Sequence, residues 1–98
     1  MPTVQTNDIQ TYYEQRGAGP PLVFIHGAVI DDHTSWIQQL DNFSDGYTTL
    51  AYDVRGHGRT SWSGRTSYSI SLLADDFETF ISEVGIEQPI LCGFTMGA

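Results

Sequence analysis

Three short apolar segments, separated by two segments of helical periodicity, most restrict the fold that this 98-residue chain can adopt. The apolar segments are residues 22–25, 47–52 and 90–92. Residues 22–25 (Leu-Val-Phe-Ile) are apolar at every position, as is typical of a strand buried on both faces of a parallel sheet. Strands that alternate with helices predict an α/β fold, in which helices cover both faces of a mostly parallel sheet.

A leading β-hairpin is predicted before the first of these segments. Residues 3–6 and 9–14 read as two strands, and Asn7 and Asp8 lie between them. Asn and Asp tolerate the left-handed backbone that a tight turn between antiparallel strands requires. The expected order is therefore β-β-β-α-β-α-β.

Both predicted helices have apolar residues on one face. The first follows the candidate N-caps Asp31, Asp32 and Thr34, and its apolar positions recur at i, i+4 and i+7: Trp36, Leu40 and Phe43. The second extends from about Ser69 to Val84, with an apolar face formed by Leu73, Phe77, Phe80, Ile81 and Val84. Asp75 and Asp76 suit the helix dipole near its start, and Gly85 is expected to end it.

Charge and hydropathy exclude several classes of protein. The net charge is −8, from twelve Asp and Glu against four arginines and no lysine. Such an acidic surface disfavours nucleic acids and anionic membranes as partners. No apolar stretch reaches the roughly 18 residues that a membrane helix needs, and the N-terminus lacks the basic start and apolar run of a secretory signal. We therefore predict a cytoplasmic protein, and the lack of lysine is a hypothesis for adaptation to concentrated salt.

Cysteine and histidine do not have the spacing of a metal centre. Cys92 is the only cysteine and lies in an apolar segment, which predicts a buried structural thiol. His26, His33 and His57 have no cysteine partner and no H-x-x-x-H spacing, so we predict no metal and no cofactor. Asp53 follows an expected strand, and we interpret it as a carboxylate that bonds the neighbouring loop.

Four segments together resemble the N-terminal half of the α/β-hydrolase fold. They are residues 24–28 (Phe-Ile-His-Gly-Ala), the helix around Trp36, residues 52–58 (Tyr-Asp-Val-Arg-Gly-His-Gly) and residues 93–97 (Gly-Phe-Thr-Met-Gly). Because these motifs span almost the whole chain in the family's order, residues 1–98 are interpreted as one incomplete α/β-hydrolase domain. The Gly-Pro-Pro segment at 19–21 and the R-G-H-G turn at 55–58 are most similar to small esterases and enol-lactone hydrolases.

The resemblance implies a nucleophile position at Thr95. Gly93 and Gly97 flank it in the pattern G-x-S-x-G, in which the nucleophile sits on a sharp strand-to-helix turn. Serine is the expected residue there. A β-branched side chain tolerates the strained backbone poorly, and its methyl group crowds the incoming carbonyl. Threonine therefore predicts lowered or lost activity.

The same resemblance implies an oxyanion hole made from backbone N–H groups. The donors would be Ala28, in the loop after the first buried strand, and Met96, which follows the nucleophile. His26 and Gly27 correspond to the scaffold of the first loop. The turn that contains His57 is structural in the family, so this histidine is not the catalytic base.

The implied function is serine-type hydrolysis of a small ester or lactone through an acyl-enzyme. The acid and the histidine of the triad follow the nucleophile in this family, so we expect little or no activity from residues 1–98 alone. The alternative is a non-catalytic hydrolase-fold protein that binds ligands or partners. A nucleotide-binding protein is disfavoured, because the glycine turn lacks both G-x-G-x-x-G and a Walker lysine.

The last predicted strand is expected to have an edge that another polypeptide could pair with. Residues 90–92 are expected inside a larger sheet, so an unpaired edge would leave apolar surface exposed. We therefore expect self-association or pairing with a C-terminal fragment.

Overall fold

The computed structural model describes residues 3–27, 32–60 and 69–93 as five strands, two α-helices and one 3₁₀-helix. Their order is β1 (Thr3–Thr6), β2 (Ile9–Arg16), β3 (Pro21–Ile25), η1 (His33–Trp36), α1 (Ile37–Asn42), β4 (Thr48–Tyr52), α2 (Ile70–Glu83) and β5 (Ile90–Gly93). This is the predicted β-β-β-α-β-α-β order, with a 3₁₀ turn added at the start of the first helix.

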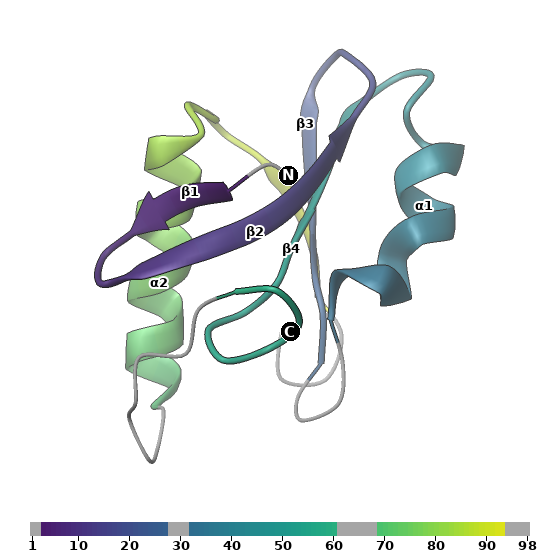
Figure 1. Ribbon diagram of the computed structural model, residues 1–98. Helices are drawn as coiled ribbons and strands as arrows, with labels where there is room; N and C mark the ends of the chain where they lie inside the picture. Colours follow the sequence, from purple (N-terminus) through teal and green to yellow (C-terminus); the bar gives the residue numbers. More distant parts are fainter. Residues whose placement is uncertain (1–2, 28–31, 61–68, 94–98) are drawn as a thin grey trace.

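The five strands form one sheet in the order β1-β2-β4-β3-β5 (Figure 1). β3 pairs in parallel with β4 and with β5, whereas β2 pairs antiparallel with β1 and β4. The α/β class is confirmed, and over these residues the sheet is mixed. The parallel part is the three-stranded unit β4-β3-β5, which brings the carboxyl ends of these strands to one edge.

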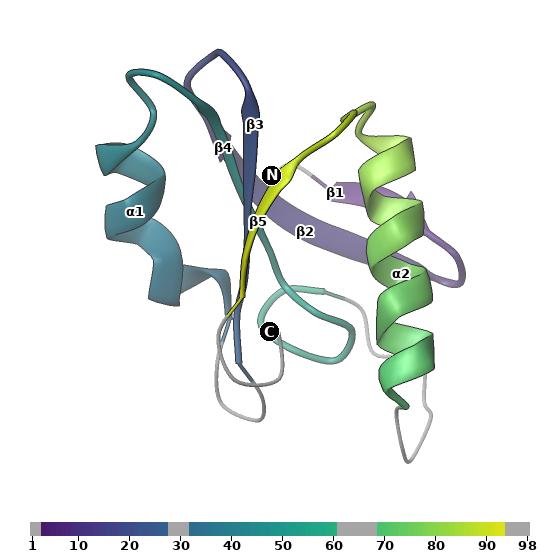
Figure 2. The same cartoon turned by 180° about the vertical axis from the view of Figure 1, so that it is seen from behind.

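Helices cover both faces of the sheet, as predicted (Figures 1 and 2). On the α2 face, Phe80 packs in a cluster with Val23 of β3 and Leu50 of β4. On the α1 face, Leu40 packs with Phe24 of β3 in a second cluster. Neighbouring residues of β3 thus belong to opposite cores, which explains why this strand is apolar at every position.

The boundaries of α2 follow from its caps. The Ser69 side chain accepts a hydrogen bond from the Leu72 backbone N–H at 3.0 Å. At the other end, Gly85 adopts a φ of 77°, and the N–H of Ile86 donates to the Ile81 carbonyl at 3.1 Å. This is the Schellman arrangement that glycine permits. The dipole interpretation was wrong, because no acidic residue lies in the first turn of α2.

The first predicted helix is divided into η1 and α1. Asp32 is the N-cap of η1, and its carboxylate accepts from the Thr34 N–H at 2.9 Å. Leu40 is completely buried, as its spacing predicts, whereas Phe43 is 45% exposed because it lies beyond the end of α1.

The hairpin and β5 lie at opposite edges of the sheet. Thr6 pairs with Ile9 across a two-residue turn, and Asn7 adopts the left-handed backbone with a φ of 53°. Ile90 and Leu91 of β5 are 51% and 52% exposed. Cys92 is only half-buried, so the prediction of a buried thiol was wrong over these residues.

None of the helices in the described residues combines the length and apolar character that a membrane crossing needs.

Candidate active site at the carboxyl edge of the sheet

The ends of β3, β4 and β5 lie side by side at one edge of the sheet. Ile25 pairs with Tyr52 on one side and with Gly93 on the other. The segments that follow these strands therefore leave the sheet together. We call the residues at these ends the carboxyl edge: His26, Gly27, Asp53, Val54 and Gly93. In parallel α/β sheets, ligands bind outside the carboxyl ends of the strands.

Three of the seven residues predicted for the site lie in the described part of the chain. These are His26, Gly27 and Gly93, and the pairing of β3 with β5 brings them together. The remaining four lie outside the described residues: Ala28, Thr95, Met96 and Gly97.

His26 is completely buried and joins two loops of the carboxyl edge. Its Nε2 accepts a hydrogen bond from the Val54 backbone N–H at 3.0 Å. Nδ1 lies within hydrogen-bond distance of the Gly27 carbonyl oxygen, so the proton belongs on Nδ1. Both ring nitrogens are engaged with the backbone, which supports the scaffold role implied for His26.

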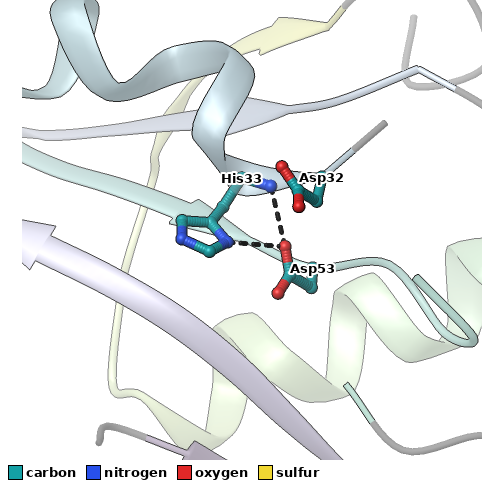
Figure 3. A group of neighbouring side chains, drawn as sticks. All are labelled: Asp32, His33 and Asp53. Carbon is teal, nitrogen blue, oxygen red and sulfur yellow. Dashed lines mark hydrogen bonds and ion pairs between the residues drawn. The ribbon is translucent and has the colours of Figure 1, made fainter. Parts of the chain in front are cut away.

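Asp53 is the second anchor of the carboxyl edge and is also completely buried. Its Oδ1 accepts from the backbone N–H of His33 at 2.7 Å and from the His33 ring Nδ1 at 2.8 Å (Figure 3). Oδ2 accepts from the Arg59 backbone N–H at 2.8 Å. The prediction that Asp53 bonds the neighbouring loop is confirmed. His33, which the sequence analysis left without a role, is a buried partner of this carboxylate.

A second set of contacts joins Asp53 to β2. The Thr60 hydroxyl donates to the Asp53 carbonyl oxygen at 2.6 Å and accepts from the Tyr12 N–H at 3.0 Å. The Tyr12 ring lies 5.0 Å from the His33 ring and 5.2 Å from the Arg59 guanidinium carbon. A hydrogen bond with the Glu14 carboxylate, together with burial, raises the pKa of Tyr12 above its ordinary value. Thr60 and Arg59 thus fasten the loop 53–60 to Tyr12 of β2.

Comparisons with known proteins agree with this arrangement. A sequence profile described as alpha/beta hydrolase fold matches residues 20–98. The chain belongs to the α/β-hydrolase family. It is 34% identical to the non-heme chloroperoxidase CPO-A1 of Kitasatospora aureofaciens, over 99% of this chain and 35% of that protein.

Solved hydrolase structures share the same backbone. The epoxide hydrolase from Vigna radiata superposes with a TM-score of 0.91 at 33% identity, covering 98% of this chain and 32% of that one. The enol-lactonase from Burkholderia xenovorans superposes with a TM-score of 0.86 at 25% identity, covering 98% of this chain and 38% of that one. The chain spans about a third of the length of the curated relatives it matches.

One group of side chains in the described part of the chain has the composition of a metal site. Ligand atoms of Asp32, His33 and Asp53 all lie within 4.8 Å of one another. However, the Asp53 oxygens already accept three N–H groups, and the same oxygen of Asp32 accepts from both the backbone and the hydroxyl of Thr34. Burial acts to raise the pKa of Asp32, but the Thr34 hydrogen bonds hold it below its ordinary value. These donors stabilise the carboxylates without a cation.

The R-G-H-G turn at residues 55–58 is fastened by a buried ion pair. Arg55 is 2% exposed, and its Nε and Nη2 bind the two carboxylate oxygens of Asp76 at 2.7 and 2.8 Å. Nη2 also binds Asp8 at 2.7 Å. The sequence analysis interpreted Asp76 as a residue that interacts with the helix dipole, and it missed this ion pair. No pattern among neighbouring residues connects positions 55 and 76.

Proposed function

We propose that this chain forms the nucleophile-bearing part of a hydrolase that cleaves a small ester or lactone through an acyl-enzyme at Thr95. The observation that carries the proposal is the parallel pairing of β5 with β3, in which Gly93 lies beside Ile25 at the carboxyl ends of the two strands. A nucleophile and an oxyanion donor must converge on one carbonyl group. The pairing of Ile25 with Gly93 at the carboxyl ends of β3 and β5 supports this convergence.

The hydroxyl group of Thr95 favours nucleophilic attack on a carbonyl carbon. The Thr95 oxygen would attack the carbonyl carbon and lose its proton to a base. The tetrahedral oxyanion would be held by the N–H groups of Ala28 and Met96 until the alcohol leaves. Water then releases the acid from the acyl-enzyme and restores the hydroxyl.

We infer that the base and its acidic partner come from polypeptide other than residues 1–98. His26 uses both ring nitrogens in backbone contacts, and His33 donates to Asp53. Loss of a triad member lowers the rate by on the order of 10⁴-fold or more. The chain alone is therefore expected to show no triad-dependent turnover.

The test combines the chain with a polypeptide that supplies the remaining two thirds of a hydrolase of this family. Labelling by a fluorophosphonate and hydrolysis of p-nitrophenyl acetate are measured for the chain with Thr95, Thr95→Ser and Thr95→Ala. We expect labelling at position 95 in the first two, faster hydrolysis with serine, and neither with alanine. Labelling elsewhere, or hydrolysis that serine does not accelerate, would refute the proposal.

Thr95 also favours one alternative, a non-catalytic hydrolase-fold protein that binds ligands or partners. Its β-branched side chain hinders attack of the hydroxyl group on a carbonyl group. In that case the completed Thr95 protein would bind an ester analogue but neither react with the fluorophosphonate nor turn over substrate.

We also propose that the free edge of β5 accepts a further strand from the polypeptide that completes the fold. Residues 90–93 include no charged side chain, and both Ile90 and Leu91 are half exposed although they point to opposite faces. Sedimentation at increasing concentration tests the competing outcome, in which two copies of the chain pair through this edge. The completing polypeptide should convert any such dimer into a one-to-one complex.

A further inference from the structure

A hollow of about 490 Å³ opens between α2 and the turn that joins β1 to β2, which lie side by side (Figure 1). Asn7 and Asp8 line it from the turn, and Asp75, Glu78 and Thr79 line it from α2. The Thr79 hydroxyl donates to Asn7 Oδ1 at 3.3 Å, so a hydrogen bond joins the two sides. Sites for small ligands usually have volumes of about 300–1,000 Å³, and this hollow falls within that range.

Arg55 forms the bottom of the hollow. It lines the hollow although it is only 2% exposed. Its Nη2 binds Asp8 Oδ1 at 2.7 Å, and Asp8 lines the hollow too, so the guanidinium end of the side chain faces it. Nε and Nη2 both bind Asp76, whereas Nη1 is buried and has no hydrogen-bond partner among the described residues. A buried donor without a partner is unfavourable, and a ligand with an acceptor atom would remove that cost.

The rim of the hollow is acidic. Asp8, Asp75 and Glu78 are exposed carboxylates, and the ion pair with Asp76 already neutralises Arg55. A cleft lined by charges of one sign concentrates ions of the opposite sign. Exposed carboxylates alone would only be hydrated, but here a buried donor that lacks an acceptor lies beneath them. The hollow therefore favours a ligand that carries both a positive charge and a hydrogen-bond acceptor.

We propose that the hollow binds a basic segment of another polypeptide: an arginine or lysine side chain pairs with Asp75 and Glu78, and a main-chain carbonyl oxygen of the same segment accepts from Arg55 Nη1. The Asp8 side chain is 54% exposed, so it can turn toward the bound cation and uncover Nη1. Leu72 also lines the hollow and offers apolar contact to the alkyl part of the basic side chain.

A polypeptide supplies both groups that the hollow requires. A metal ion would meet the carboxylates but give Nη1 no acceptor, and an anion would be repelled by the rim. A second copy of this chain is disfavoured as the partner, because its net charge is −8 and it contains no lysine. None of the residues in this site belongs to the carboxyl edge, so the inference does not rest on the proposed hydrolase activity.

The test is an NMR titration of the ¹⁵N-labelled 98-residue chain with a capped tripeptide that has arginine between two glycines. We expect saturable shifts of the Asp8, Leu72 and Thr79 amides, which line the hollow. Two further probes separate the two contacts. Butylguanidinium keeps the cation but has no carbonyl group, whereas the same tripeptide with citrulline keeps the carbonyl groups but has no charge. Each should bind on the order of tenfold more weakly than the arginine tripeptide.

The critical variant combines Asp75→Asn with Glu78→Gln, which removes two charges at exposed positions of α2. The matched control combines Glu83→Gln with Glu87→Gln, two exposed carboxylates that are not among the lining residues of the hollow. Circular dichroism establishes that each is folded. The first pair should weaken binding of the arginine tripeptide on the order of tenfold, and the control should change it less than about twofold.

Three results would overturn the inference. The first is the absence of saturable shifts at the hollow with the arginine tripeptide. The second is equal weakening by the two variants, which would show that only the net charge of the chain matters. The third is butylguanidinium that binds as tightly as the tripeptide, which would leave Arg55 Nη1 without a role and the site without preference for a polypeptide. If the Asp75 and Glu78 variant does not fold, the three probes on the wild-type chain decide.

Discussion

Replacing Asp76 by asparagine is expected to destabilise this fold far more than the same replacement at an exposed carboxylate. Asp76 is 5% exposed and binds two nitrogens of Arg55, which is itself 2% exposed. Hydrogen bonds with the Asp76 carboxylate outweigh burial and raise the pKa of Arg55 above its ordinary value. The guanidinium therefore stays charged inside the protein.

The magnitude follows from what asparagine leaves behind. It keeps one acceptor for Nη2 but turns an NH₂ donor toward Arg55 Nε, so one hydrogen bond to a charged group is lost, worth about 1.5–3 kcal/mol. The remaining partner, Asp8, has a side chain that is 54% exposed. Breaking a buried ion pair costs about 3–5 kcal/mol in total. We expect about 3 kcal/mol, a large share of the roughly 5–15 kcal/mol that stabilises a domain.

The assay is thermal and urea unfolding followed by circular dichroism. A loss of about 3 kcal/mol corresponds to a fall in Tm of roughly 12–24 °C for a domain of this size. Asp75→Asn is the matched control, because Asp75 is the exposed neighbour on the same helix. Asp8→Asn should cost less than Asp76→Asn, because the Asp8 side chain is 54% exposed and Arg55 keeps both hydrogen bonds to Asp76. If Asp76→Asn costs no more than these two variants, the ion pair does not stabilise the fold as argued.

Three further results are expected. Gly58→Ala should destabilise by at least about 2 kcal/mol in urea unfolding, because its φ is +49° and the new Cβ meets the Asp53 carboxylate; Gly46→Ala, with nothing within 4 Å, should change stability by less than about 1 kcal/mol. Burial, with the nearby charge of Asp76, raises the pKa of Tyr52. The neutral phenol is therefore favoured in the folded state, and its contribution to stability is complete below about pH 10 and declines above it. Tyr52→Phe should flatten this alkaline decline, and an unchanged decline would contradict the assignment. Finally, if the net charge of −8 reflects adaptation to salt, the unfolding midpoint should rise between low and molar potassium chloride, and a flat response would exclude it.

Much of the fold could be predicted because its signals are local. The second helix was expected from about Ser69 to Val84 and is found at Ile70–Glu83, since a serine cap and a glycine stop mark its ends. The strand at 22–25 was recognised from its apolar run and is found at Pro21–Ile25. Such signals depend only on neighbouring residues, so no knowledge of the tertiary structure is needed to read them.

The polar contacts of the site could not be predicted in the same way. His33 and Asp53 are twenty residues apart, and Arg55 and Asp76 are twenty-one apart. No periodicity connects such pairs, because each is created by the strand order rather than by the chain's local conformation. The exposure of Cys92 has the same origin, since burial of an apolar strand depends on which neighbour lies beside it.

Two buried side chains of the carboxyl edge, His26 and Asp53, hold backbone segments in place. His26 and Asp53 have the chemistry of a base and an acid, yet both are bound to the backbone: His26 to Gly27 and Val54, and Asp53 to the N–H groups of His33 and Arg59. A buried group that already binds several N–H donors is a poor proton carrier, because proton transfer would require breaking those bonds. The same bonds make it an effective anchor. In the function proposed above, His26 and Asp53 therefore serve as anchors of the backbone, and other side chains supply the acid-base chemistry.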